Sequence, residues 1–262
     1  MSTPKVLHIT ARDNPSLQRL RKLSQDAAAY RKLGSVWLEG DHLARALLQR
    51  GQQPTLAVVS EAAYAEPALR ELADAAPRVL VLPLALFKSI SGLESPAQIG
   101  FEVAHVAGLS PLKGVDSVVL DRLQDAGNVG TILRSAAAFG FRQVLALKGT
   151  AALWSAKVLR AGMGAHFGLR LVEGLAPEDL DGLDLPLIAT SSHAQSQLHQ
   201  TRLPSPCAWV MGHEGQGVQP ALMQRCGLTV GIPQPGGEES LNVGSAAAIC
   251  LYESARQRLV AA

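Results

Sequence analysis

The chain has 262 residues, of which 47% are hydrophobic and 18% are charged, and its formal net charge is +2. This composition excludes an intrinsically disordered protein, and the length suits one large domain or two small ones. Only 4% of the residues are aromatic, which argues against a surface that binds single-stranded nucleic acid mainly by stacking. The small net charge does not settle whether nucleic acid is a partner, so the distribution of basic residues has to decide.

The cysteines and the apolar runs bear on the location of the protein. Cys207, Cys226 and Cys250 are odd in number and widely spaced, and they match neither a disulfide framework nor a metal site. Residues 1–5 lack the apolar core of a signal peptide. The longest apolar run, 79–87, is too short to span a membrane. We therefore expect a cytoplasmic protein that binds neither membrane nor metal.

The first hundred residues predict a small α/β unit. Asn14-Pro15 is typical of an N-cap followed by proline at the first helical position, and leucines follow at helical spacing until Gly34 provides a stop. The alternation of strands and helices that follows predicts a mostly parallel sheet. The expected strands are 36–40, 55–59, 78–82 and 98–106, and the expected helices are 43–48 and 67–75.

Basic residues are concentrated near the amino terminus. Between residues 12 and 32, six basic side chains stand against two acidic ones. A solvated helix face and a surface for the RNA backbone are equally compatible with this pattern. The candidates for RNA contact in this segment are Arg19, Lys22 and Arg31.

A polar bridge at 108–114 contains glycine and proline, and we predict a domain boundary there. The chain would then comprise an N-terminal domain (1–107), a linker (108–114) and a C-terminal domain (115–262). Stronger α/β alternation begins at residue 115. The strands expected there are 118–120, 143–147, 169–172, 187–190, 208–211 and 228–232. Residues 121–130 are expected to form a loop that turns into a helix ending at Gly140, and the other expected helices are 155–163, 220–225 and 241–259.

Two glycine-rich turns, 210–218 and 232–240, surround the short strand at 228–232. Glycines in the first turn allow the main chain to approach a ligand closely. Ser240 stands where an alanine-rich helix is expected to begin, and its hydroxyl would cap the N–H groups of residues 241–243. We interpret these turns as a loop system that wraps around a small molecule.

Three separated blocks resemble the motifs of the SpoU (TrmH-like) branch of the SPOUT RNA methyltransferases. Residues 120–135 are similar to the first motif, 212–217 to the second, and Ile232-Pro233 with 239–243 to the third. Their order and spacing agree, which makes coincidence of all three improbable. The resemblance covers residues 115–259. The segment around Glu39-Gly40 is similar to the ribosomal-protein-like substrate-binding domain of many members.

Two positions depart from the family pattern. Ala126 stands where members usually have proline, which would loosen the entry to the loop. Gly162 stands where serine is common, so a hydroxyl contact at that position is absent.

The resemblance implies an α/β fold with a C-terminal SPOUT domain, a mostly parallel sheet and a trefoil knot, together with a smaller N-terminal α/β domain. It also implies S-adenosylmethionine bound in the knot and a homodimer whose interface builds the site. A sulfonium methyl group is already activated, so the transfer needs no metal. The cofactor-binding residues that it implies are Thr190, Gly212, Glu214, Gly217, Ile232 and Leu241.

The resemblance assigns Arg134 to the ribose 2′-hydroxyl. Arginine is effectively always protonated, so we expect Arg134 to clamp a phosphate and stabilise developing alkoxide rather than to act as a base. Glu214 and Asn242 have alternative roles in bracing or capping their own loops. The catalytic set implied by the resemblance is Asn128, Arg134, Glu214, Ser240 and Asn242.

Lys157 and Arg160, about one helical turn apart, are further candidates for RNA phosphates, and a solvated face is the alternative. The function implied is 2′-O-ribose methylation of RNA, with ribosomal RNA favoured over tRNA because of the separate N-terminal domain. An RNA-binding module without catalysis is one rival. A nucleotide-dependent oxidoreductase is the other, although Gly127-Asn-Val-Gly130 lacks the dinucleotide fingerprint.

Overall fold

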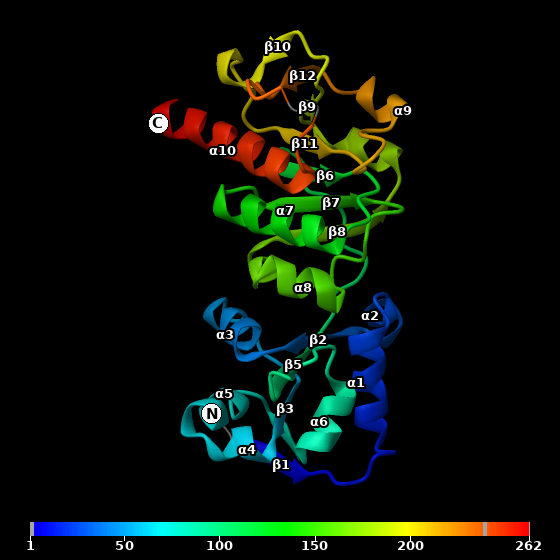
Figure 1. Cartoon of the computed structure of the whole chain (residues 1–262), viewed down its shortest axis with the longest axis vertical. Coiled ribbons are helices and arrows are strands. Elements are labelled where there is room, and N and C mark those ends of the chain that lie inside the picture. The colour runs from blue at the N-terminus through cyan, green and yellow to red at the C-terminus, as the bar shows by residue number, and fades with distance from the viewer. Residues whose placement is uncertain (1–2, 238–239, 262) are drawn as a thin grey trace. The chain divides into compact units, whose positions relative to one another are not determined.

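The computed structural model describes residues 3–237 and 240–261 (Figure 1). Glu239, which belongs to the third motif, lies outside the described residues. The chain divides into two compact units. Unit 1 comprises Met1–Ala107 together with Trp154–Phe167, and unit 2 comprises Gly108–Leu153 together with Gly168–Ala262. The break at residues 107 and 108 falls at the start of the polar bridge, but residues 154–167 belong to unit 1.

Unit 1 contains a five-stranded sheet in the order β1-β4-β3-β5-β2 within the described residues. β4 pairs in parallel with β1 and β3, whereas β5 pairs antiparallel with β3 and β2. Four of the five strands therefore run in the same direction, as expected for a mostly parallel sheet, and β5 alone among the described strands of this unit runs back, between β3 and β2. The strands are β1 (Lys5–His8), β2 (Ser35–Glu39), β3 (Leu56–Ser60), β4 (Arg78–Leu82) and β5 (Ile99–Ala104).

The predicted start of the first helix is confirmed. The side chain of Asn14 accepts a hydrogen bond from the N–H of Ser16, and Pro15 is the first helical residue. Gly34, at a φ of +64°, ends a separate second helix rather than the first. The helices of unit 1 are α1 (Pro15–Gln25), α2 (Ala29–Leu33), α3 (Asp41–Gln49), α4 (Glu61–Ala65), α5 (Pro67–Ala73), α6 (Leu84–Ile90) and α8 (Ala156–Gly162).

A segment from the second half of the chain completes unit 1. Helix α8 packs against β2 and α1. The side chain of Gln52 donates a hydrogen bond to the carbonyl of Phe167 (3.2 Å), and the ring of Trp154 meets His105 edge-on at 5.9 Å. Residues far apart in the sequence therefore share one core, which local hydrophobic patterns do not reveal.

Unit 2 is built on a parallel sheet, as expected for the C-terminal domain. Its seven strands, counted over the described residues, have the order β10-β12-β9-β11-β6-β7-β8, and every pairing is parallel. The strands are β6 (Ser117–Leu120), β7 (Gln143–Leu147), β8 (Arg170–Leu175), β9 (Leu187–Thr190), β10 (Ser196–Gln197), β11 (Ala208–Met211) and β12 (Leu228–Gly231).

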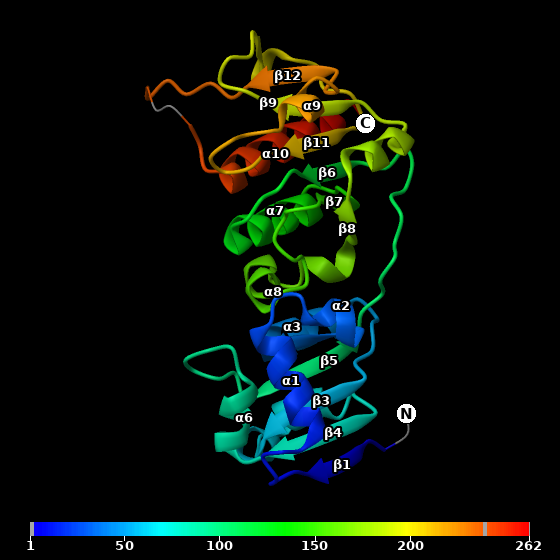
Figure 2. The ribbon, with the colours of Figure 1, turned by 90° about the vertical axis from the view of Figure 1, so that its right-hand side faces the viewer.

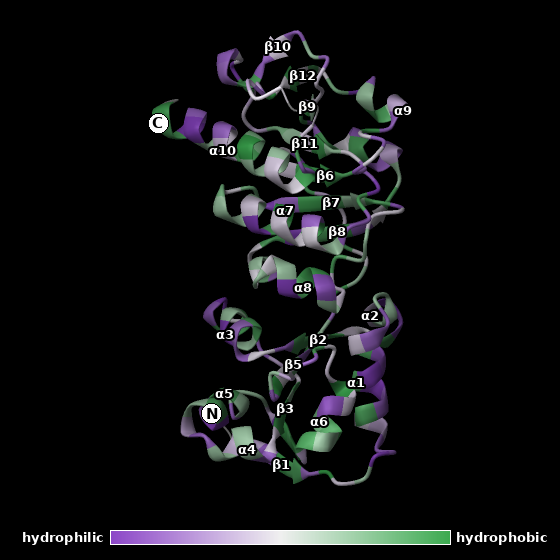
Figure 3. Ribbon diagram, in the orientation of Figure 1, coloured by the Kyte–Doolittle hydropathy of each residue, from purple (hydrophilic) through white to green (hydrophobic). Residues whose placement is uncertain are grey.

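Both faces of this sheet are covered, which explains its continuous hydrophobic strands (Figure 3). Helices α7 (Ala126–Ala138) and α10 (Val243–Ala261) pack against each other on one face (Figures 1 and 2). A 3-10 helix (Pro177–Leu183) and α9 (Pro220–Met223) contribute buried leucines to the core on the other face. Trp209 is fully buried, and its indole N–H donates to Ser254 of α10 (2.9 Å).

The parallel sheet brings the motif loops to one edge. Loops that leave the carboxyl ends of parallel strands lie at the same edge of the sheet. The strand order places β12, β9, β11 and β6 side by side. The chain that leaves β12 must then pass β9 to reach α10, which packs against α7 and β11. None of the helices within the described ranges is both long and apolar enough to cross a bilayer.

Candidate active site

The loop between β6 and α7 is fastened at the beginning of the helix. Asp125 is the N-cap of α7, and its carboxylate accepts a hydrogen bond from the N–H of Asn128 (2.7 Å). Ala126 is the first helical residue, a position where proline fits because its missing N–H has no helical partner. The departure from the family pattern at Ala126 therefore leaves the start of the helix intact.

Glu214 joins the loop after β11 to the loop after β6. Its carboxylate accepts hydrogen bonds from the N–H groups of Gln124 (3.3 Å) and Asp125 (3.0 Å) and from the side-chain amide of Asn128 (3.3 Å). Burial by itself raises the pKa of Glu214, but these bonds and one from its own backbone outweigh burial and hold that pKa below its ordinary value. The carboxylate is thus held in its charged form as a bridge between two motifs.

Asn242 connects the third motif to the same network. Its amide N–H donates to Asn128 Oδ1 (2.9 Å), while its Oδ1 accepts from the N–H groups of Gly244 (2.9 Å) and Ser245 (3.2 Å). Asn242 is therefore the cap of α10, and the predicted capping role of Ser240 is wrong. The helix begins at Val243, two residues later than expected, so Asn242 occupies the capping position.

The glycine-rich turn after β11 closes on itself. His213 and Gly217 exchange two backbone hydrogen bonds, of 3.0 and 2.8 Å. The ring Nδ1 of His213 accepts the N–H of Gly215 at 3.0 Å, so this histidine braces the turn. Gly212 lies so close to the other side of the turn that an added Cβ would stand 2.2 Å from the carbonyl carbon of Gly217. Only a glycine fits there.

A small pocket of about 170 Å³ lies among the loops that follow β9 and β12. Small-molecule sites usually measure about 300–1,000 Å³, so this pocket has room for only part of such a ligand. Four predicted site residues line it, and Gly212, Glu214 and Gly217 are not among its lining residues. The lining residues are Thr190, Ser191, Ser192, Ile232, Gln234, Ser240, Leu241 and Ala246.

Arg134 remains available for a ligand. It is exposed, and no hydrogen bond or ion pair joins it to residues 3–237 or 240–261. Thr131 lies beside Gly244, with Cγ2 3.2 Å from where a Cβ would be added to that glycine. Arg134 is three residues further along α7, on the neighbouring part of the same helix side. No hydrogen bond or ion pair links Arg134 to the network of Asn128, Glu214 and Asn242 among the residues described.

The comparison with protein families gives a decisive match. Residues 117–252 match the SpoU rRNA Methylase family, which is more than half of the chain. The chain belongs to this family. The predicted resemblance and the SPOUT type of fold are thereby confirmed.

Individual relatives agree with this membership. An uncharacterised tRNA/rRNA methyltransferase of Synechocystis is 31% identical over 99% of this chain and 97% of the relative. A 23S rRNA (guanosine-2′-O-)-methyltransferase of Bordetella pertussis is 39% identical over 54% of this chain and 59% of the relative. An AdoMet-bound rRNA methyltransferase from Sinorhizobium meliloti has a similar structure, with a TM-score of 0.83 and 25% identity, over 97% of this chain and 98% of that one.

The pocket suits the nucleoside part of S-adenosylmethionine, the cofactor of the family. Ile232, Leu241 and Ala246 provide apolar surface, and the neighbouring serine and threonine residues provide hydroxyl groups. The Oε1 atom of Gln234 is shielded from solvent and accepts no hydrogen bond from the described residues. A buried acceptor of this kind is costly unless a ligand or water supplies a donor. The residues present therefore fit the group.

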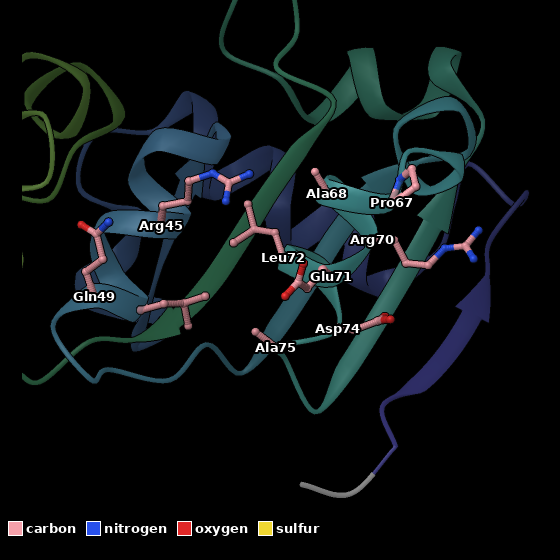
Figure 4. A pocket seen from close by; sticks show the side chains of 10 residues that line it. Arg45, Gln49, Pro67, Ala68, Arg70, Glu71, Leu72, Asp74 and Ala75 are labelled. Carbon is pink, nitrogen blue, oxygen red and sulfur yellow. The ribbon is translucent and has the colours of Figure 1, made fainter.

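Size alone would identify a different cavity. A hollow of about 780 Å³ lies in unit 1 between α3 and α5, and none of the predicted site residues lines it. Figure 4 shows Arg45 and Gln49 on one wall and Glu71 on the other. Its mixed charge indicates no particular ligand.

The proposed RNA-binding residues differ in how strongly other protein groups already engage their side chains. The guanidinium of Arg19 is 2.8 Å from a carboxylate oxygen of Glu102 and also bonds to Ser35 (2.8 Å). It is thus committed to the fold. Lys22 and Lys157 are exposed. A guanidinium nitrogen of Arg160 lies beside Gly92, 3.6 Å from where its Cβ would be.

The absence of a hydroxyl at position 162 now has a structural explanation. The buried ring of His166 occupies the space that a side chain at Gly162 would need. An added Cβ would be 2.5 Å from Cε1 and 2.9 Å from Nδ1 of that ring. His166 in turn packs against Trp154, with ring centroids 5.2 Å apart. The His166 ring can therefore occupy this space only while residue 162 is glycine.

Sequence reasoning missed three residues of the site. Asp121 is fully buried beside the loops, Gln219 bonds to it, and Gln234 lines the pocket. Asp121 follows a buried strand directly, which is the local signal that could have drawn attention to it. Neither glutamine has such a signal, because its role depends on partners far away in the sequence.

The charge of Glu214 predicts a pH dependence. A carboxylate with a lowered pKa in the folded state contributes stability above its unfolded pKa, and this contribution is lost as the pH falls through the folded value. We expect the melting temperature of the wild type to fall below about pH 4.5, and the Glu214→Gln variant to lose less over that acidic range. Thermal unfolding from pH 3.5 to 8 measures both. Parallel curves for the two proteins would contradict this expectation.

Replacing Gly162 with alanine is expected to destabilise unit 1. The collision with the His166 ring should cost about 1–3 kcal/mol of the free energy of unfolding, as is usual for overpacking. Gly182→Ala is the matched control, because a Cβ there meets nothing within 4 Å. A double-mutant cycle with His166→Ala, measured by denaturant unfolding, should show coupling between the two positions. Additive effects would mean that the ring is not the obstacle.

Proposed function

We propose that this protein transfers a methyl group from S-adenosylmethionine to a ribose 2′-hydroxyl of ribosomal RNA. The observation that carries the proposal is the joining of all three family motifs by Asn128, Glu214 and Asn242, next to a pocket suited to a nucleoside. Curated relatives named as 23S rRNA 2′-O-methyltransferases support the choice of substrate.

The loops after β9, β11 and β12 would bind the cofactor, and the hydrogen bonds among Asn128, Glu214 and Asn242 would keep the motif loops in place. Thr190, Ile232 and Leu241 line the pocket and would contact the nucleoside, while the closed turn at Gly212 and Gly217 would supply main-chain groups. The bound cofactor supplies a methyl group that is already activated as a sulfonium. No metal is needed for this transfer.

Arg134 is proposed to act on the acceptor. Its guanidinium would clamp a neighbouring phosphate in two-pronged fashion and so fix the position of the 2′-oxygen. As the oxygen loses its proton, the same positive charge would stabilise the developing alkoxide. The proton would pass to phosphate or water, because arginine is not a base at physiological pH. Ser240, in the pocket wall, is a further candidate for contact with the reacting groups.

Unit 1 is proposed to recognise the RNA. Lys22 on α1 and Lys157 and Arg160 on α8 come from distant parts of the sequence, yet α1 and α8 pack together within this unit. Arg31, which also lies over the ring of Tyr30, is the fourth candidate. Neutralising such residues should flatten the salt dependence of RNA binding.

A homodimer, a trefoil knot and a cytoplasmic location belong to the same proposal. Helix α10 exposes large apolar side chains, among them Tyr252 (54% exposed) and Leu259 (80%), which a second copy would cover. Sedimentation analysis tests the dimer, and a monomer at micromolar concentration would argue against it. The return of the chain from β12 to α10 is compatible with a knot. A ribosomal RNA substrate supports a cytoplasmic location of the protein.

Mapping of ribose methylation tests the function. Purified protein, labelled S-adenosylmethionine and ribosomal RNA transcripts should give label in a nucleotide that resists alkaline cleavage at one site. The same site should lose its methyl group in a deletion strain. The alternative substrate is tRNA, which the name of one relative, a tRNA/rRNA methyltransferase, also includes. Modification of tRNA alone would favour that alternative. Cofactor binding without any transfer would favour a silent RNA-binding module.

A further inference from the structure

A buried carboxylate lies beneath the glycine-rich turn. Asp121 directly follows β6 and is completely buried. Its oxygens accept hydrogen bonds from the backbone N–H of Gln219 (2.7 Å) and from the side-chain amide of the same residue (3.0 Å). Gln219 ends the turn that begins at Gly212. The carboxylate therefore holds one end of this turn against the end of a neighbouring strand.

The next residue supplies the balancing charge. Arg122 Nε is 2.9 Å from Asp121 Oδ1, and Nη2 is 3.4 Å from Oδ2. The third guanidinium nitrogen, Nη1, donates to the side-chain carbonyl of Gln216 (3.2 Å), near the tip of the turn. A single arginine thus links the buried carboxylate to the exposed end of the loop.

The backbone of Arg122 adds a second, independent observation. Its φ is +58°, in the left-handed region that side-chain-bearing residues seldom occupy. Such a conformation costs free energy and persists only where the surroundings maintain it. Here Cγ of Arg122 lies over Gly149, 3.3 Å from where a Cβ would be added. The strained backbone directs the guanidinium toward both of its partners.

The turn 212–219 is consequently fastened at three points. Glu214 accepts hydrogen bonds from the backbone of the loop after β6, Gln216 accepts one from Arg122, and Gln219 donates to Asp121. The carboxylate of Glu214, in this turn, thus binds the loop after β6, and the carboxylate of Asp121, at the start of that loop, binds this turn. Few degrees of freedom then remain for the turn to lose when a ligand binds, which is the physical basis of preorganisation.

We propose that Asp121 and Arg122 are positioning residues that hold the turn 212–219 in its cofactor-binding shape before the cofactor arrives, and that Arg122 is not an RNA ligand. This inference rests on the proposed function. Each of the three guanidinium nitrogens of Arg122 already donates to a protein group, and Asp121 neutralises its charge, so little attraction for a phosphate remains. Without Arg122 the buried carboxylate would lose its counter-charge and the turn would lose its tip contact.

Calorimetric titration with S-adenosylhomocysteine tests the proposal without any turnover. We expect Arg122→Gln to raise the Kd for this ligand about tenfold, the scale of losing hydrogen bonds to a charged group. Asp121→Asn should act in the same direction. Arg142→Gln is the control, because Arg142 is an exposed arginine that precedes β7 at the opposite edge of the sheet, and its Kd should stay within twofold of the wild type. Melting curves show which variants are folded. If Asp121→Asn does not fold, Arg122→Gln alone still tests the proposal.

A salt titration of RNA binding separates the two roles of Arg122. The slope of log Kd against log salt should be the same for Arg122→Gln as for the wild type. Unchanged affinity for S-adenosylhomocysteine together with a slope reduced by about one would overturn the proposal, because that is the signature of one lost phosphate contact. A wild type that binds no S-adenosylhomocysteine would instead overturn the proposed function, and the premise of this inference with it.

Discussion

Replacing Gly212 with alanine is expected to weaken cofactor binding about a hundredfold. The new Cβ would lie 2.2 Å from the carbonyl carbon of Gly217 and 2.2 Å from the N of Val218. Both are backbone atoms, so no side chain can rotate away. The two hydrogen bonds between His213 and Gly217 would have to break before the turn could open.

The size of this effect follows from the strain. Overpacking costs about 1–3 kcal/mol, and a loss near the upper end corresponds to about a hundredfold increase in Kd. Titration with S-adenosylhomocysteine measures it. Gly215→Ala is the matched control in the same turn, because the nearest atoms to its added Cβ are 3.9 Å away. Equal affinity of the two variants would show that the closed turn does not hold the cofactor.

Removing the side chain of Arg134 is expected to lower kcat by about 100- to 1,000-fold, the range seen when one group that stabilises transition-state charge is deleted. The affinity for the cofactor should change less than twofold, because Arg134 neither lines the pocket nor bonds to the loop network among the described residues. Single-turnover methylation with saturating RNA, combined with titration of S-adenosylhomocysteine, separates these two quantities. Arg142→Ala, an exposed arginine at the other edge of the sheet, serves as control.

The conservative variant Arg134→Lys distinguishes a clamp from a simple positive charge. Lysine keeps the charge but loses the planar pair of donors, so we expect activity between those of the wild type and of Arg134→Ala. Near-normal turnover with an unchanged pH profile would contradict the two-pronged clamp. An acidic shift of the pH profile would indicate that the side chain at 134 itself takes the proton.

Much of unit 2 could be predicted from local sequence. The apolar runs of β6, β7 and β11 are buried on both faces and are bounded by glycine or charged residues, so their strands were expected close to where they occur. The first helix of unit 1 was equally clear from Asn14, Pro15 and the spaced leucines. In each case the signal lies within a few residues of the element that it predicts.

The features that the sequence did not indicate lie where distant segments meet. The direction of β5 depends on its pairing with β2 and β3, which no local pattern records. The packing of α8 onto unit 1 depends on surfaces more than a hundred residues earlier in the chain. The cap of α10 was misplaced by two residues because serine and asparagine cap equally well, and the contact between Asn242 and Asn128 distinguishes them.

The sequence alone indicated the family, because its motifs consist of particular residue types in a fixed order along the chain, and the resemblance to the family implied the cofactor and the motif residues. The folded structure showed that Asn128, Glu214 and Asn242 form one network and that Asp121 lies beneath it. It also showed that Arg19 is committed to Glu102. Hydrogen bonds and burial join residues by distance in space, and the spacing of residues along a chain does not carry that distance.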